Sequence, residues 1–171
     1  MNKEISLATF AGGCFWCTEA VFQRVKGVLK VTPGYSGGHI SNPTYEQVTS
    51  GDTGHAEAIQ IEFDPDVVNY EYLLKIHFKT HDPTTLNQQG NDIGTQYRSI
   101  VFYHNENQLE VIKKVLKTLT YEKPIVTEVK EFVKFYEAED YHKNYYNEHK
   151  SQPYCQIIIK PKLEKAFGRD Y

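Results

Sequence analysis

The sequence predicts an α/β (α+β) two-layer sandwich, in which helices flank a mixed β-sheet. Some segments alternate apolar and polar residues, others repeat apolar residues at helical spacing, and the two kinds of segment alternate along the chain. The chain has 171 residues, of which 40% are hydrophobic and 24% charged, and this composition is typical of a globular domain. Because no repeat or low-complexity linker marks a boundary, we expect a single domain over residues 1–171.

The N-terminal half is predicted to contain three strands and one helix. The apolar run at 5–11 predicts a strand that ends at two glycines. Residues 14–25 follow a helical stripe without Gly or Pro inside it, which indicates a helix. Apolar residues at 28–32 predict a second strand, followed by a loop rich in turn residues. At 55–64 the odd-numbered positions are apolar and the even-numbered ones are polar, which predicts a strand with one buried face.

The C-terminal half continues the alternation of helices and strands. Helical spacing of apolar residues predicts an amphipathic helix at 70–79, and a polar loop follows at 82–96. A strand is predicted at 98–104, after which Asn105 and Gln108 form the capping-box pattern of a helix start. The remaining predicted elements are a strand at 126–136, a short helix at 139–149 that is dense in Tyr and His, and a C-terminal tail.

Charge and hydropathy exclude several classes of function. Nineteen Lys plus Arg against 22 Asp plus Glu give a net charge of −3, which provides no basic surface for nucleic acid or an anionic membrane. No stretch approaches the roughly 20 apolar residues of a membrane span, and the N-terminus lacks the layout of a signal peptide. Three cysteines are an odd number, which argues against the closed disulfide framework of a secreted protein. We therefore expect a cytoplasmic protein with free thiols.

Cys14 is the first candidate for chemistry, because it follows Gly12 and Gly13 at the end of a strand and opens a predicted helix. The free N–H groups at a helix N-terminus stabilise a thiolate and can lower the pKa of a cysteine. The arrangement would present a nucleophile with little steric shielding. A small buried hydrophobic residue is the alternative interpretation, and position alone does not decide between the two.

Cys17 completes a CxxC motif with Cys14, and three interpretations of it are open. A dithiol redox pair is one, because residues at i and i+3 share a face of a helix. A zinc half-site is the second, but no second CxxC exists, so Cys155 and a scattered His would have to complete it. The third is that Cys17 simply packs on the helix. The motif favours redox chemistry over metal binding.

Glu57 is a candidate acid, because it shares its strand parity with Ile59 and Ile61. Its carboxyl should point toward the apolar side, where desolvation raises the pKa and lets a neutral carboxylic acid donate a proton. At the end of a strand the side chain could instead reach water. Tyr45 and Tyr97 lie in or beside long loops, where a hydroxyl is more often functional than in a helix stripe.

Several segments together resemble the peptide methionine sulfoxide reductase family, type A. These blocks are Gly13–Trp16 with Thr18–Glu19, Gly34–Gly38, Asn42–Tyr45, Gly54–Glu57, His81–Thr84, Gln89–Ser99 and Ala138–His142. They come in the family's order and span most of the chain. The resemblance implies a ferredoxin-like fold with long coil and a C-terminal tail, and an oxidoreductase that reduces methionine (S)-sulfoxide, free or in proteins, to methionine. Such an enzyme repairs proteins after oxidative stress.

The resemblance also implies roles for individual residues. Cys14 matches the family's nucleophile, which would release methionine and become a sulfenic acid. Glu57 matches the acid that protonates or hydrogen-bonds the sulfoxide oxygen. The other matches are Tyr45 and Tyr97, which share that task, Asp92 as a supporting polar group, and Phe15 and Trp16 as the apolar pocket that holds the substrate's methyl group.

A second thiol has to resolve the sulfenic acid, and Cys155 is the expected one. It lies in a segment that resembles the part of the family where many members carry their resolving cysteine, and a flexible tail over about 150–171 would bring it to Cys14. Cys17 is the rival resolving thiol. Some family members have Gly at that position, so the thiol in this chain departs from their pattern. The resemblance implies that thioredoxin or another dithiol then reduces the disulfide, with no organic cofactor and no metal. We expect a monomer.

Three other functions stay open from the sequence alone. A thiol–disulfide oxidoreductase that uses Cys14 and Cys17 would leave Glu57 without a role. A metal-binding or redox-sensing thiolate module would not be an enzyme. A family member that prefers free methionine sulfoxide is the third.

Overall fold

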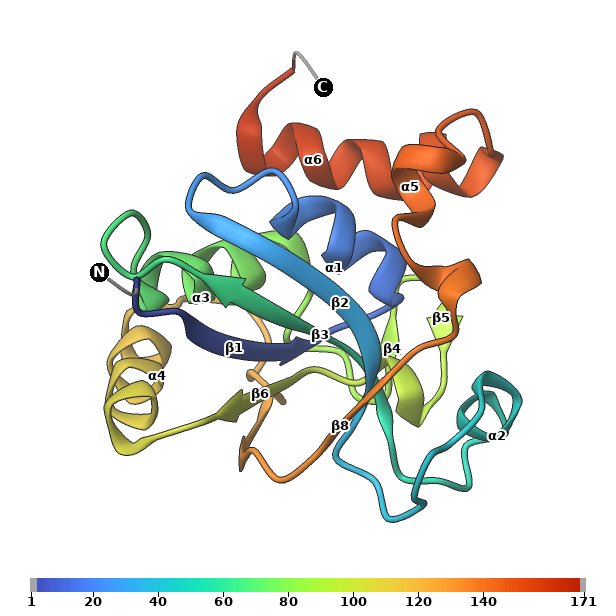
Figure 1. Ribbon diagram of the computed structural model, residues 1–171, viewed down its shortest axis with the longest axis horizontal. Helices are drawn as coiled ribbons and strands as arrows, with labels where there is room; N and C mark the ends of the chain where they lie inside the picture. Colours follow the sequence, from blue (N-terminus) through green and yellow to red (C-terminus); the bar gives the residue numbers. More distant parts are fainter. Residues whose placement is uncertain (1–2, 170–171) are drawn as a thin grey trace.

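The computed structural model describes residues 3–169 and is built around a twisted sheet with helices packed against it (Figure 1). The strands are β1 (Ser6–Ala11), β2 (Val28–Ser36), β3 (Ala56–Phe63), β4 (Gln88–Gln89), β5 (Asp92–Ile93), β6 (Ile100–Tyr103), β7 (Glu128–Glu131) and β8 (Phe135–Glu137). The helices are α1 (Phe15–Phe22), α2 (Tyr45–Thr49), α3 (Tyr70–Thr80), α4 (Glu106–Thr118), α5 (Tyr145–Glu148) and α6 (Lys160–Phe167). The structure confirms the predicted α/β class, a mixed sheet with flanking helices.

The main sheet has the strand order β7-β6-β1-β3-β2-β8, and β4 and β5 form a separate small hairpin. Neighbouring strands of the main sheet are antiparallel except for β6 and β7, which are parallel. Helix α1 connects β1 to β2, and α3 connects β3 to β6, so the four central strands have β-α-β-β-α-β connectivity. Both helices lie side by side on one face of the sheet (Figure 1), and α6 packs against both of them.

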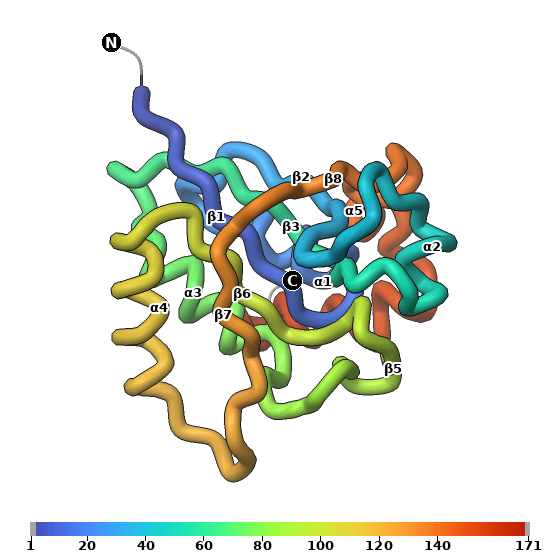
Figure 2. The backbone as a smooth tube through the Cα atoms, turned by 90° about the horizontal axis from the view of Figure 1, so that it is seen from below, coloured from blue at the N-terminus to red at the C-terminus, as the bar shows by residue number. Residues whose placement is uncertain are grey.

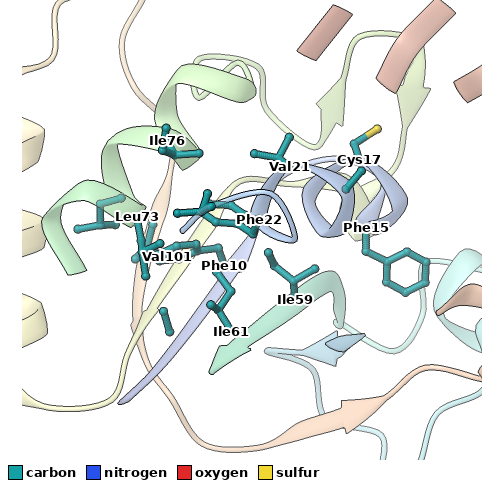
Figure 3. Close-up of a cluster of buried hydrophobic side chains, with 14 of the residues drawn as sticks. Phe10, Phe15, Cys17, Val21, Phe22, Ile59, Ile61, Leu73, Ile76 and Val101 are labelled. Carbon is teal, nitrogen blue, oxygen red and sulfur yellow. The ribbon is translucent and has the colours of Figure 1, made fainter. Parts of the chain in front are cut away.

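The core lies between the sheet and these helices. Figure 3 shows Phe10, Ile59 and Ile61 of the sheet facing Phe22 of α1 and Leu73 of α3. All five side chains are fully buried, as the alternation of apolar residues in β3 predicts. The opposite face of the sheet carries a smaller apolar cluster. Its members are Ala11, Ala56, Ala58, Ile100 and Phe102, covered by Phe132 and Phe135.

The strand predicted at 126–136 is wrong, because two separate strands occupy that segment. β7 pairs with β6 at one edge of the sheet and β8 pairs with β2 at the other edge. The chain between them crosses the alanine-rich face, as Figure 2 shows from below. The helix predicted at 139–149 is likewise shorter: a 3-10 turn at Asp140–His142 precedes α5.

The C-terminal segment, expected as a tail over about 150–171, forms a π-helical turn (Cys155–Ile159) and α6. Cys155 and Leu163 are fully buried in the same core as α1. Residues 170–171 of the predicted tail and residues 1–2 of the predicted domain lie outside the described residues. That the chain forms one catalytic domain and that its tail is flexible stay predictions. Within residues 3–169, none of the helices has the length and apolar character needed to cross a bilayer.

Truncation of Ile59 should destabilise the fold, because this side chain is 0% exposed in the centre of the sheet. We expect Ile59→Ala to lower the free energy of unfolding by about 2–5 kcal/mol through lost burial and the cavity left behind. Ile5→Ala is the matched control, since Ile5 is 53% exposed, and it should change that free energy by less than about 0.5 kcal/mol. Urea denaturation measures both, and equal losses would contradict the assigned core.

Candidate active site

Cys14 is the N-cap residue of α1, directly after β1 and two glycines. Gly13 has a φ of +81°, in the left-handed region, and its N–H donates to the carbonyl oxygen of Tyr97 at 3.1 Å. A Cβ on Gly12 would lie 2.7 Å from the ring of His81. The backbone at this turn therefore requires glycine at both positions, and the half-buried Cys14 thiol is held at the start of the helix.

Glu57 of β3 lies close to Cys14, inside the protein. Its side chain is 1% exposed, and one carboxyl oxygen accepts a hydrogen bond from the N–H of Phe15 at 3.1 Å. The other oxygen, Oε2, has no hydrogen-bond partner within residues 3–169. Burial raises the pKa of Glu57 to about 8, despite the hydrogen bond from Phe15, and the charges of Asp92 and Cys17 add to the rise. At neutral pH the carboxyl is protonated, and its free oxygen can carry the proton.

Tyr45 and Tyr97 come from different elements and surround the same carboxyl. Tyr45 is the first residue of α2, and its N–H donates to Glu139 Oε2 at 3.0 Å. Tyr97 ends a 3-10 turn at Thr95–Tyr97. Burial raises the pKa of Tyr45 to about 12 and also raises the pKa of Tyr97, and the charges of Glu57 and Cys14 act on both. Both hydroxyl groups are therefore protonated hydrogen-bond donors near the thiol and the acid.

Asp92 lies at the site but contacts a residue that the sequence analysis did not single out. Its Oδ2 accepts a hydrogen bond from the hydroxyl of Tyr154 at 2.9 Å. The same hydroxyl lies 3.5 Å from the sulfur of Cys17. Tyr154 thus connects the β4–β5 hairpin, which carries Asp92, to the thiol of α1.

An aromatic wall surrounds Trp16. Its ring stacks on Tyr145 at 3.7 Å, and its indole N–H donates to His142 Nδ1 at 3.1 Å. The ring of Phe15 lies 5.0 Å from His142 but is 1% exposed. Trp16 is half-buried, so part of its ring can contact a ligand. Phe15 belongs to the buried core (Figure 3).

Cys14 and Cys17 form a hydrogen-bonded pair whose two thiols have very different pKa values. Burial raises the pKa of Cys14 well above its usual value, and Cys17 and Glu57 add to this rise. The pKa of Cys17 falls to about 7, because Cys14 donates a hydrogen bond to it and because Lys162 and Tyr154 lie nearby. The lowered pKa that the sequence led us to expect at Cys14 is therefore found at Cys17, and the negative charge of the pair lies on Cys17.

Cys155 is not at the surface of the site. Its side chain is 0% exposed, and burial followed by the charge of Cys17 raises its pKa. The π-helical turn that carries it packs on α1. The structure therefore brings all three cysteines to one region, with Cys155 in the innermost position.

A cavity of about 410 Å3 opens at the two thiols. It is lined by Cys14, Cys17, Gln89, Gly90, Asn91, Asp92, Tyr154, Ile157, Ile158 and Lys162. A larger cavity of about 740 Å3 shares Gln89 and Lys162 with it, but no cysteine lines that cavity. Within residues 3–169, no group of three or more His, Cys, Asp or Glu side chains is placed to hold a metal ion. The smaller cavity is therefore the one that reaches the thiols, and among the residues that line it Glu57, Tyr45, Tyr97 and Trp16 are not found.

The sequence analysis missed Glu139, His142, Tyr145 and Tyr154. Two signals were available: Glu139 and His142 lie in the block Ala138–His142 that resembles the family, and the helix predicted at 139–149 is dense in Tyr and His. In the structure these residues hold Trp16, Tyr45 and Cys17 in place across more than 90 residues of sequence.

Comparisons with known proteins show which family the chain is similar to. The family model described as peptide methionine sulfoxide reductase matches residues 6–171. The peptide methionine sulfoxide reductase MsrA of Saccharolobus solfataricus is 56% identical over 163 residues, which cover 94% of this chain and 92% of that protein. The reduced form of Mxr1 from Saccharomyces cerevisiae superposes with a TM-score of 0.84 at 33% identity, covering 89% of this chain and 90% of Mxr1. Mxr1 in complex with Trx2 superposes with a TM-score of 0.59 at 22% identity, covering 85% of this chain and 89% of Mxr1.

The raised pKa of Glu57 should make stability fall with rising pH. A carboxyl with an ordinary pKa of 4.5 in the unfolded chain and about 8 in the folded protein favours folding fully below pH 4.5, and this contribution is lost as the pH rises through 8. Glu57→Gln should therefore flatten the decline in unfolding free energy between pH 5 and about 8. Urea denaturation across that range measures it.

Glu62→Gln is the matched control, because Glu62 lies on the same strand with its side chain on the opposite face. A decline of the same slope in the wild type and in Glu57→Gln would contradict the assignment of a protonated Glu57.

Proposed function

This chain belongs to the peptide methionine sulfoxide reductase family, and we propose that it uses Cys14 as the nucleophile and Glu57 as the acid on the (S)-sulfoxide of methionine. The chain is an oxidoreductase that reduces methionine sulfoxide with its own thiols and so repairs oxidised proteins. The observation that carries the residue assignment is a buried carboxyl, neutral at pH 7, that accepts a hydrogen bond from the residue after Cys14.

A sulfoxide needs both an acid and a thiol at one place. Its sulfur is a poor electrophile until the oxygen is protonated, so a neutral acid and a nucleophilic sulfur have to coexist. Glu57 Oε2, which has no hydrogen-bond partner in the described part of the chain, is the oxygen that would donate. Tyr45 and Tyr97 remain protonated at neutral pH and would hold the sulfoxide oxygen beside it.

The reaction transfers one oxygen atom. Cys14 attacks the sulfur of the protonated sulfoxide, the S–O bond of the substrate breaks, and Cys14 ends as a sulfenic acid while methionine leaves. The proton donated by Glu57 stays on that oxygen, and the proton of the Cys14 thiol returns to Glu57. No external reductant enters this step.

The substrate's methyl group would rest against Trp16, whose half-buried ring is held by Tyr145 and His142. Phe15 would act from behind that surface, because its side chain is 1% exposed. A flat aromatic wall suits an apolar methylthio group and keeps water from the acid.

Thioredoxin, or another external dithiol, is the proposed electron donor, and Cys155 is the proposed intramolecular thiol of the recycling path. The yeast relative Mxr1 has been solved together with Trx2, which supports this partner. Three cysteines at one site supply the thiols for a disulfide without an organic cofactor or metal.

The finer points of architecture are also proposals. The β-α-β-β-α-β connectivity of the four central strands supports a ferredoxin-like two-layer core, to which α6 adds a further helix. The odd number of cysteines supports a reducing compartment such as the cytoplasm. We propose that the chain acts as a monomer and as one catalytic domain.

Replacement of the acid should slow the chemical step. We expect Glu57→Gln to lower the single-turnover rate of methionine formation by about 100-fold, the usual contribution of a general acid. The wild-type rate should also fall as the pH rises through about 8, where Glu57 loses its proton, and this fall should be absent from Glu57→Gln. Quenched-flow measurement at pH 6 to 9 tests both, with Glu62→Gln as control. A Glu57→Gln rate equal to that of the wild type would remove Glu57 from the role of acid.

Separated sulfoxide epimers test the substrate and the nucleophile together. Prereduced enzyme should convert the S epimer and not the R epimer. Cys14→Ser should convert neither epimer. Glu57 accepts a hydrogen bond from the N–H of Phe15, and Cys14 is the cysteine next to Phe15 in the chain. Chromatographic counting of methionine released per chain gives the result. If Cys14→Ser still forms methionine, the nucleophile is misassigned.

Rapid reduction of insulin without loss of sulfoxide would favour a thiol–disulfide oxidoreductase instead.

A further inference from the structure

We propose that Cys17 is the first thiol to resolve the Cys14 sulfenic acid, that Tyr154 and Asp92 take up its proton, and that Cys155 acts only in a second, later exchange. This inference rests on the proposed function of Cys14. It changes the order of the thiols that the family resemblance implied, in which Cys155 reacts first.

The backbone already places Cys14 and Cys17 at disulfide distance. The N–H of Cys17 donates to the carbonyl oxygen of Cys14 at 3.0 Å, which closes a tight turn between residues i and i+3. Such a turn keeps the two Cα atoms within about 7 Å, and disulfides span about 4.4–6.8 Å. Both side chains line the same cavity. A Cys14–Cys17 bond therefore needs adjustment only within the first turn of α1.

Cys155 is placed very differently. Its side chain is 0% exposed, and in the part of the chain that the structure describes it does not line the cavity at Cys14. To reach Cys14 the π-helical turn at Cys155–Ile159 would have to open. Opening it would pull Tyr154 away from Asp92 and Cys17. It would also break the edge-to-face contact of Tyr154 with Trp16, whose ring centroids lie 5.9 Å apart. Cys155 therefore reacts after a conformational step that Cys17 does not need.

Tyr154 provides a route for the proton of Cys17. The carboxylate of Asp92 only accepts hydrogen bonds, so the Tyr154 hydroxyl donates to it at 2.9 Å. In molecules where Cys17 is protonated, its thiol, 3.5 Å away, can then donate to the Tyr154 oxygen. The chain Cys17–Tyr154–Asp92 leads a proton from sulfur to carboxylate as the sulfur becomes nucleophilic. Lys162, whose charge lowers the pKa of Cys17, stabilises the thiolate from the same cavity.

Resolution and recycling are two separate exchanges at sulfur. Cys17 loses its proton along this route and attacks the sulfur of the Cys14 sulfenic acid; the S–O bond breaks, the S–S bond forms, and the hydroxyl leaves with that proton as water. In the second step the Cys155 thiolate attacks Cys17 of the new disulfide. A Cys17–Cys155 bond forms, and Cys14 is released as a thiolate for another substrate. An external dithiol, such as thioredoxin, then reduces the second disulfide.

The order of the thiols is tested by following the sulfenic acid itself. Prereduced wild type, Cys17→Ser and Cys155→Ser are mixed with methionine (S)-sulfoxide, quenched with dimedone at timed intervals, and mapped for disulfides by mass spectrometry. Cys155→Ser should lose its sulfenic acid at the wild-type rate and accumulate the Cys14–Cys17 bond. Cys17→Ser should keep its sulfenic acid at least about 10-fold longer. Rapid loss in Cys17→Ser with a direct Cys14–Cys155 bond would overturn the proposal.

A second arm separates this inference from the proposed function. Hydrogen peroxide forms a sulfenic acid without any sulfoxide. Because Cys17 carries the negative charge of the pair, mass spectrometry of the dimedone adduct first assigns the sulfenic acid to Cys14 or Cys17, and only the Cys14 adduct is followed in the same variants. The amount of methionine formed in the first arm tests sulfoxide reduction alone. If no methionine forms, the proposed function fails, and the peroxide arm still decides which thiol reacts first. Persistence of the sulfenic acid in Cys17→Ser supports Cys17 as the first resolving thiol, and persistence in Cys155→Ser overturns it.

The role of Tyr154 as a positioning residue has its own measurement. In the peroxide arm, the rate of sulfenic acid loss in the wild type should rise with pH as Cys17 loses its proton, and the midpoint of that rise is measured. Tyr154→Phe and Asp92→Asn should each shift that midpoint in pH, because each interrupts the proton route. Tyr72→Phe is the matched control, an exposed tyrosine of α3 outside the cavity. A midpoint unchanged in Tyr154→Phe would overturn the proton route.

Discussion

The burial of Glu57 is the constraint on which the rest of the site depends. A carboxyl that is 1% exposed and accepts only one hydrogen bond from the described part of the chain is more stable with its proton than without it. Burying it costs stability at high pH, and the sheet tolerates the cost because Ile59 and Ile61 on the same strand are packed without contact with water. The fold is thus built to keep one acid neutral at the pH where a neighbouring thiol reacts.

Cys14, the N-cap residue of α1, and Cys17, in its first turn, have pKa values shifted in opposite directions. Burial and the nearby Glu57 carboxyl raise the pKa of Cys14. The hydrogen bond from Cys14 and the charge of Lys162 lower the pKa of Cys17. A pair that shares one proton shows two widely separated ionisations, and only the first falls near neutral pH. The pair of thiols therefore holds one negative charge at a time beside Glu57. A second thiolate would add a repulsion that this buried environment does not offset.

Much of the site could be predicted from the sequence, because local patterns position its central members. Strict alternation along β3 indicated the inward direction of Glu57, and two glycines before Cys14 indicated the turn into α1. The segment at 126–136 could not be resolved in this way. Its strands pair with β6 and β2 at opposite edges of the sheet, and that pairing depends on residues far away in the sequence. The three isoleucines of the C-terminal segment, β-branched and unfavourable in a helix, concealed its helical turn.

The position of Tyr154 between two cysteines links the fold to the order of chemistry. Because Tyr154 and Cys155 are adjacent in the chain, the turn that would release Cys155 also carries away the hydroxyl that contacts Cys17 and Asp92. Cys17 is assisted only while this turn is closed, and Cys155 becomes accessible only after it opens. The two thiols therefore cannot compete for the same sulfenic acid on equal terms. Sequence adjacency of one tyrosine and one cysteine is enough to separate resolution from recycling in time.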